Sequence, residues 1–278
     1  MLQVFHTVSE NCSRIVAEKY STSFCSAIRL LHKDMRAPIF NIYGFVRFAD
    51  EIVDTFHDHD KALLLSRFKN ETYDAIDRGI SLNPILHSFQ LTVNEYGIDR
   101  QLIAAFFRSM ELDLTKKVYN EEEYGEYIYG SAEVVGLMCL YIFTKSDMQM
   151  YHKLVPSARA LGAAFQKVNF LRDLKEDTYS LARMYFPGCD FNNFLETDKK
   201  QIEDDIQHDF REAYLGILQL PVQARFGVYV AYKYYLSLFR KIKRTHPCHI
   251  LQKRIRIPDH LKLMIVVRAG LKHQLKLI

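Results

Sequence analysis

Two stretches of this chain each carry a pair of aspartates four residues apart, in otherwise apolar surroundings. Asp50 and Asp54 form the first pair, and Asp173 and Asp177 form the second. Residues at positions i and i+4 lie on the same side of an α-helix, so each pair presents two carboxylates together. Two like charges at this spacing destabilise an isolated helix by about 0.2–0.5 kcal/mol. We therefore expect a cation between them, and Mg²⁺ bridging to a phosphate is the leading candidate.

Polar residues extend each aspartate pair into a narrow line at helical spacing. Tyr43 and Arg47 precede the first pair, and Gln166 and Asn169 precede the second. The other faces of both stretches are apolar, and a helix that is apolar almost all round is buried. Its polar line must then be satisfied inside the protein, for example by a cavity that holds water or ligand. A single Asp-x-x-x-Asp on a helix is usually a solvated face, but two copies with these flanks favour a shared metal site.

The pattern of the whole chain predicts α-helices and no sheet. Its 278 residues include only 11 Gly and 7 Pro, and no run alternates as a strand would. No Gly/Ser/Pro-rich linker divides the chain, so we expect one all-α domain over residues 1–278. Pro38 and Pro221 suit first-turn positions of their helices. The stretches with helical periodicity are 8–32, 36–56, 60–78, 82–96, 99–116, 120–146, 149–177, 200–217, 220–244 and 258–277.

Several familiar chemistries are missing from the sequence. It has no Gly-x-Gly-x-x-Gly or Walker loop, no Gly-x-Ser-x-Gly and no His-Glu-x-x-His. The five scattered cysteines form no metal motif and read as free thiols, so we expect a cytoplasmic protein. No run of 18 apolar residues predicts a membrane span. The His-Asp-His-Asp run at 57–60 follows the first aspartate pair, and we interpret it as a solvated linker.

Positive charge is concentrated near the end of the chain. Residues 231–278 hold twelve Lys or Arg and one acidic residue, Asp259, whereas the rest of the chain has more acidic than basic residues. A solvated helix face, contact with an anionic membrane surface and a contribution to an anionic substrate site are all open interpretations. No nucleic-acid-binding motif accompanies the charge, so nucleic acid is not an expected partner.

Read with their flanks, these segments resemble the squalene and phytoene synthase family over most of the chain. The resemblance implies an isoprenoid synthase fold, in which helices surround a central cavity. It also implies head-to-head condensation of two prenyl diphosphates through a cyclopropyl diphosphate. The matching segments are Ser23-Phe24, Arg36, residues 43–54, 110–114, 127–138, 166–177 and 183–187.

Residue roles follow from this resemblance by position. The four aspartates and Asn169 would hold Mg²⁺, or Mn²⁺ in its place. The four aspartates, Tyr43 and Tyr127 would form the catalytic set. The residues expected at the substrate are Ser23, Phe24, Arg47, Gln166, Asn169, Arg172, Tyr235 and Arg254, of which the arginines would bind diphosphate oxygens. Apolar walls would exclude water from the reaction, and each candidate taken singly is more often a plain core residue. The candidates are Phe24, Phe40, Val134, Val135, Leu137, Met138, Phe165 and Phe170.

The sequence departs from the family pattern at a few positions. Ile128 replaces a common Cys, and Ala182 replaces the Gly before Arg183. Glu133 stands where many members have Gly, and it would narrow the tunnel and add a charge if it faced inward. We expect Glu133 to turn away or to pair with an arginine.

The expected reaction is the joining of two geranylgeranyl diphosphates to phytoene in carotenoid biosynthesis. The missing C-terminal membrane span, the missing nicotinamide-binding signal and the segment 183–187 favour phytoene over squalene formation. The close alternative is squalene or dehydrosqualene formation from two farnesyl diphosphates, with NADPH required only for squalene. A more distant alternative is a non-catalytic helical module that binds membranes or proteins through its basic tail. Chain-length choice and oligomeric state stay open.

Overall fold

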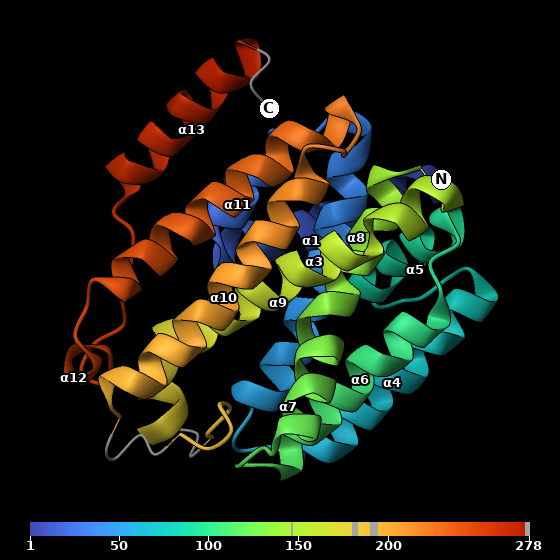
Figure 1. The fold of residues 1–278 in the computed structure, drawn as a ribbon. Coiled ribbons are helices and arrows are strands. Elements are labelled where there is room, and N and C mark those ends of the chain that lie inside the picture. Colours follow the sequence, from blue (N-terminus) through green and yellow to red (C-terminus); the bar gives the residue numbers. More distant parts are fainter. Residues whose placement is uncertain (146, 180–182, 190–193, 276–278) are drawn as a thin grey trace.

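The computed structural model describes residues 1–145, 147–179, 183–189 and 194–275, and in these residues the chain is helical without a strand (Figure 1). An isolated bridge joins Val118 to Met184. The all-α prediction is therefore confirmed. The elements are α1 (Leu2–Tyr20), α2 (Thr22–Ile28), α3 (Lys33–Asp54), α4 (Lys61–Arg78), α5 (Pro84–Tyr96), α6 (Arg100–Thr115), α7 (Glu121–Ile128), the π-helical turn η1 (Tyr129–Glu133), α8 (Val134–Phe143), α9 (Met148–Tyr179), α10 (Glu196–Ile217), α11 (Val222–Lys243), α12 (Pro247–Ile250) and α13 (Asp259–Gln274).

Most predicted helices agree with these bounds within a few residues, and the differences have local causes. The stretch 8–32 is divided at Ser21, whose extended backbone ends α1 and whose side chain caps α2 by accepting from the Phe24 amide. Pro38 lies inside α3 rather than in its first turn, because α3 begins at Lys33. Pro221 is the N-cap of α11. The stretch 120–146 is interrupted by η1, and the short α12 was not predicted.

Helices α3 and α9 carry the two aspartate pairs and both lie inside the bundle (Figure 1). Helix α3 packs against α1, α5 and α8, while α9 packs against α8, α10 and η1. Glycines permit the close approach of α9 to α8 and η1: a Cβ on Gly162 would lie 2.6 Å from the Ala132 carbonyl oxygen, and one on Gly136 would lie 2.9 Å from that of Ala158. Both aspartate helices are thereby held against the same short helix.

The orientation of α3 about its own axis is set by an aromatic cluster on its far side. Phe45 stacks on Phe89 with ring centroids 3.8 Å apart and also packs against Phe68, Phe106 and Phe107. All five rings are buried, and Phe45 is fully so. Burying a side chain of this size contributes roughly 1.5–3 kcal/mol relative to exposing it. With Phe45 packed into this cluster on one side of α3, the line Tyr43–Arg47–Asp50–Asp54 lies on the opposite side of the helix.

Buried apolar residues form one continuous cluster that runs from α1 to α13. None of the helices in the described part of the chain combines the length and hydrophobicity needed to cross a membrane.

Candidate active site

A cavity of about 500 Å³ lies between α3, α9 and the helices around them. Most of its charged lining comes from the second halves of α3 and α9, together with Asp113 of α6, Arg183 and Arg254. Its apolar lining comes mainly from the earlier turns of α3 and α9 and from α2, α8, α10 and α11. The cavity is therefore amphiphilic, as a substrate with an anionic head and an apolar tail requires. The predicted site residues that line it are Phe24, Tyr43, Arg47, Asp50, Asp54, Tyr127, Gln166, Asn169, Arg172, Asp173, Asp177, Tyr235 and Arg254.

Some residues predicted from the sequence do not reach the cavity. Ser23 is absent from the lining, and Ser21, the cap of α2, lines it instead. Among the predicted wall residues, those that line the cavity are Phe24, Val135, Phe165 and Phe170. The other four candidates do not line the cavity and are buried in the hydrophobic core, the more common role of such residues: Phe40, Val134, Leu137 and Met138.

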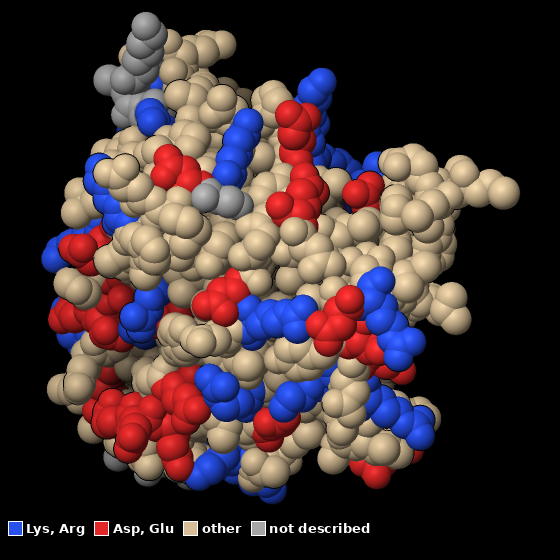
Figure 2. Space-filling view, turned by 90° about the vertical axis from the view of Figure 1, so that its right-hand side faces the viewer, with Lys and Arg blue, Asp and Glu red and all other residues tan. Residues whose placement is uncertain are grey.

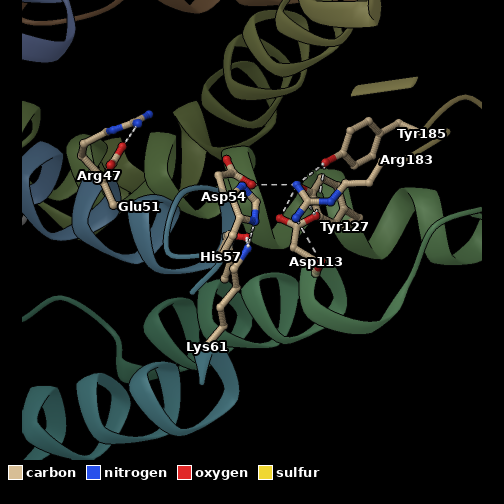
Figure 3. A network of polar contacts seen from close by, with 10 residues as sticks. Arg47, Glu51, Asp54, His57, Lys61, Asp113, Tyr127, Arg183 and Tyr185 are labelled. Atoms are coloured by element: carbon tan, nitrogen blue, oxygen red, sulfur yellow. Dashed lines mark hydrogen bonds and ion pairs between the residues drawn. The ribbon is translucent and has the colours of Figure 1, made fainter. Parts of the chain in front are cut away.

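Arg183 connects the two aspartate regions (Figure 3). Its Nη1 donates to Asp54 Oδ1 at 2.7 Å, and its backbone N–H donates to the Asp177 carbonyl oxygen at 2.8 Å. Arg183, which lies six residues after Asp177, thus binds Asp54, the last residue of the first aspartate pair. Both aspartate regions therefore face the same polar end of the cavity.

Asp113 on α6 forms the floor of this polar end. Its carboxylate is buried and accepts hydrogen bonds from the hydroxyls of Tyr127 at 2.7 Å and Tyr185 at 3.2 Å. Burial raises the pKa of Asp113 to about 6, although the nearby Arg183 guanidinium opposes the shift. Asp113, Arg183 and Tyr185 were assigned no role from the sequence. The available signal was that they lie in two of the segments, 110–114 and 183–187, that resemble the family.

The neighbouring arginines do not fully neutralise the buried aspartates. Burial first, and then the neighbouring Asp54, raises the pKa of Asp50 to about 8, while Arg47 opposes the shift. Burial and the neighbouring Asp173 raise the pKa of Asp177 to about 8, with Arg183 opposing. Each aspartate region therefore has one carboxyl group that retains a proton near neutral pH. A divalent cation would replace that proton.

The donor atoms fit a divalent ion that enters together with a diphosphate. Asn169 Oδ1 is buried and has no hydrogen-bond partner, so a neutral oxygen ligand is available between the aspartates and Gln166. Within the described residues, no three His, Cys, Asp or Glu side chains are grouped closely enough to hold a metal by themselves. Mg²⁺ commonly takes one or two carboxylates and completes its shell with waters and substrate phosphate oxygens.

Three arginines stand at the polar end, as the resemblance predicts. Arg172 and Arg254 both pair with Asp173, with Arg254 Nε 2.7 Å from Asp173 Oδ1. Arg47 pairs with Glu51 and lies 4.3 Å from the centroid of the Tyr20 ring, and its Nε is buried without a hydrogen-bond partner. Guanidinium groups bind phosphate oxygens in a bidentate manner. These side chains are placed to receive an anionic head group.

Aromatic rings line the cavity beside the polar end. Phe165 stacks on Tyr235 with centroids 3.9 Å apart, and Phe24 packs edge-on against Tyr235 and at a tilt against Tyr43. Burial raises the pKa of the Tyr43 and Tyr235 hydroxyls, so both stay protonated at neutral pH. Faces of such rings attract cations. This wall could therefore stabilise a carbocation near the polar end.

Two polar features of the sequence lie outside the cavity. Glu133 pairs with Arg159 at 2.5 Å and does not line the cavity, which agrees with its expected pairing to an arginine. The run 57–60 is exposed between α3 and α4, which agrees with a solvated linker.

Comparisons with known proteins agree with this geometry. Residues 17–260 match the family model described as squalene/phytoene synthase. The chain is 26% identical to a phytoene synthase from Arthrospira platensis, over 95% of this chain and 92% of that protein. It is 29% identical to a chloroplastic phytoene synthase 2 from Solanum lycopersicum, over 84% and 79%. The crystal structure of a dehydrosqualene synthase superposes with a TM-score of 0.82 at 18% identity, over 98% of both chains, which shows the fold.

The raised carboxyl pKa values predict how stability depends on pH in metal-free protein. A carboxyl whose pKa is near 8 when folded and near 4 when unfolded loses stabilisation as pH rises from about 4 to 8, because the unfolded state releases its proton first. Asp177→Asn removes this titration. We expect the variant to gain melting temperature relative to wild type, and to gain more at pH 8 than at pH 5.5, in thermal scans with EDTA.

Asp58→Asn, a substitution in the exposed linker, is the matched control and should follow the wild-type pH profile. A difference between Asp177→Asn and wild type that stays constant across this pH range would contradict the shifted pKa of Asp177.

Proposed function

We infer the reaction from one premise: the chain belongs to the squalene/phytoene synthase family. It is a prenyltransferase-type enzyme, and prenyl diphosphates are the expected substrates of that family. We propose that it joins two geranylgeranyl diphosphates head to head through a cyclopropyl diphosphate, releases diphosphate and makes phytoene for carotenoid biosynthesis. The observation that carries the proposal is the amphiphilic cavity, with two aspartate regions at its polar end.

Diphosphate binding is the first task of the polar end. Asp50, Asp54, Asp173, Asp177 and Asn169 would hold Mg²⁺ or Mn²⁺, which supplies Lewis-acid stabilisation of the leaving diphosphate. Arg47, Arg172 and Arg254 would bind diphosphate oxygens directly. Arg172 and Arg254 share Asp173 as a partner, so a diphosphate can draw one guanidinium group toward it while the other stays paired with Asp173.

Protection of the allylic cation is the task of the walls. Apolar side chains from α8, α10 and α11 line the cavity and would exclude water, so the cation would meet the second prenyl chain rather than solvent. The stacked Phe165 and Tyr235 rings and the neighbouring Tyr43 offer faces to a cation close to the diphosphate. Tyr127 is held by Asp113 at the floor, where it would shape the position of the reacting ends.

We propose geranylgeranyl rather than farnesyl diphosphate as the substrate because of two sequence features and the names of the relatives. The segment 183–187 resembles that of phytoene synthases, and the sequence has no nicotinamide-binding signal. Several of the relatives it resembles are named phytoene synthases. Squalene or dehydrosqualene formation from farnesyl diphosphate is the alternative that the same assay detects.

Purified protein incubated with geranylgeranyl or farnesyl diphosphate and Mg²⁺, with and without NADPH, identifies the reaction through the extracted hydrocarbon. We expect phytoene from geranylgeranyl diphosphate, unaffected by NADPH and abolished by EDTA. Asp50→Asn and Asp173→Asn should keep the helical circular dichroism signal and lose about 100-fold or more in turnover, as when one group that stabilises developing charge is removed.

Other outcomes of this assay reject the proposal in distinct ways. Dehydrosqualene, or squalene with NADPH, from farnesyl diphosphate would establish the alternative substrate. Absence of diphosphate release from either substrate would favour a non-catalytic binding module. Full activity in EDTA would reject the metal assignment.

We propose in addition that α13 makes peripheral contact with an anionic membrane surface. Ala269 is the buried residue of α13, which packs on α11, while Leu263, Val267 and Leu271 are each more than half exposed on one face. The region 231–278 has twelve basic residues and one acidic residue, which suits anionic lipid head groups. By contrast, the face drawn in Figure 2, which lies away from α13, shows acidic and basic side chains side by side.

Co-sedimentation with lipid vesicles checks the role of α13. We expect binding to vesicles that contain anionic lipid, weaker binding to zwitterionic vesicles or at high salt, and loss of binding when Leu263, Val267 and Leu271 are all changed to Ser. Leu82→Ser, at an exposed apolar residue between α4 and α5, is the control and should bind like wild type. Equal sedimentation of the triple variant and wild type would contradict this contact.

A further inference from the structure

Arg183 contacts more groups than a simple diphosphate-binding arginine needs. Its side chain is 7% exposed, and its guanidinium reaches Asp54 Oδ1 at 2.7 Å, the Asp113 carbonyl oxygen at 3.1 Å and the Tyr185 hydroxyl at 3.3 Å. It also lies 3.7 Å from Asp113 Oδ1. Figure 3 shows the guanidinium between Asp54 and the Asp113 group. Arg183 therefore has two acidic partners, which differ in their surroundings.

The partner on α6 is fixed. The Asp113 side chain is 4% exposed, and both of its carboxylate oxygens accept hydrogen bonds from tyrosines. A buried carboxylate of this kind requires a nearby cation. The backbone around Arg183 is fixed as well, because its N–H donates to the Asp177 carbonyl and the next N–H, of Met184, donates to the Lys117 carbonyl. Arg183 cannot leave Asp113 without exposing or neutralising it.

The partner on α3 can be exchanged. Asp54 is the last residue of α3, and its side chain is 41% exposed and faces the cavity. A carboxylate that accepts a charge-assisted hydrogen bond from a guanidinium is a weaker ligand for a cation. A metal that binds Asp54 must compete with Arg183 for it.

We propose that Arg183 is a resident counter-ion, which stays bound to Asp113, holds Asp54 while metal and diphosphate are absent, and releases Asp54 when they enter. It is a positioning residue, because it acts on the site through Asp54. The inference rests on the proposed function, since it takes Asp54 as a metal ligand. The contact offsets part of the repulsion between Asp54 and the neighbouring carboxylates, and it weakens metal binding at Asp54 until diphosphate enters.

Mn²⁺ binding in the absence of substrate tests the competition without using turnover. The double variant Arg183→Gln/Asp113→Asn removes one positive and one negative charge together, so the formal charge near the site is unchanged. We expect it to bind Mn²⁺ about tenfold more tightly than wild type, the order of one charge-assisted hydrogen bond, as read from the free Mn²⁺ signal in electron paramagnetic resonance. Equal or weaker binding, or no binding to either protein, would overturn the proposal.

Arg159→Gln/Glu133→Gln is the control, because it also removes one positive and one negative charge, from an ion pair that lies outside the cavity. It should bind Mn²⁺ like wild type, and tighter binding by this control would also overturn the proposal. If the first double variant does not fold, Arg183→Lys takes its place. A lysine ammonium that pairs with Asp113 lacks the planar set of donors that lets a guanidinium bind Asp54 at the same time. We therefore again expect tighter Mn²⁺ binding, and unchanged binding would overturn the proposal.

The readout separates this inference from the proposed function. Tighter Mn²⁺ binding by the variant together with no hydrocarbon product from wild type would contradict the proposed function alone. Hydrocarbon synthesis by wild type together with equal Mn²⁺ affinities would contradict the counter-ion role alone.

Discussion

Carboxylates gathered at one end of an apolar cavity need positive charge, and the arrangement of this protein follows from that requirement. Asp50, Asp54, Asp113, Asp173 and Asp177 all line the same cavity. Burial, and then the neighbouring carboxylates, raise the pKa of Asp50 and Asp177 to about 8, and the nearby arginines oppose this rise without cancelling it. Arg172 and Arg254 form ion pairs with Asp173, and Arg183 forms ion pairs with Asp54 and Asp113. Under the proposed function, a metal ion and diphosphate that bind together would supply the remaining positive charge.

The packing of the helices directs these carboxylates into the cavity rather than toward solvent. The stack of Phe45 on Phe89 fixes one side of α3, and the contacts of Gly136 and Gly162 bring α9 close to α8 and η1. Charged groups held between helices in this way are costly unless they are paired or ligated. An ordinary structural core would gain nothing from such an arrangement, whereas a site for an anionic substrate and its metal depends on it.

The sequence predicted what depends on local periodicity and missed what depends on distant partners. The helix ranges and the inward lines on α3 and α9 follow from spacing alone. Thirteen of the predicted site residues line the cavity, and several of these, such as Tyr127, Tyr235 and Arg254, were predicted from the family resemblance rather than from spacing. Arg183 and Asp54 are 129 positions apart, so their contact has no local signal. Ser23 was predicted at the substrate, but Ser21 lines the cavity instead, because the chain breaks between α1 and α2 at Ser21. The turning of Phe40 and Met138 into the core depended on which face of each helix the neighbouring helices cover.

Anomalous scattering from crystals grown with Mn²⁺ and inorganic pyrophosphate tests the central claim most directly. The account predicts Mn²⁺ peaks at the polar end of the cavity, bound by oxygens of both aspartate regions and of the pyrophosphate, with Arg47, Arg172 or Arg254 on the remaining phosphate oxygens. Peaks confined to the outer surface, or pyrophosphate bound away from Asp50, Asp54, Asp173 and Asp177, would contradict it.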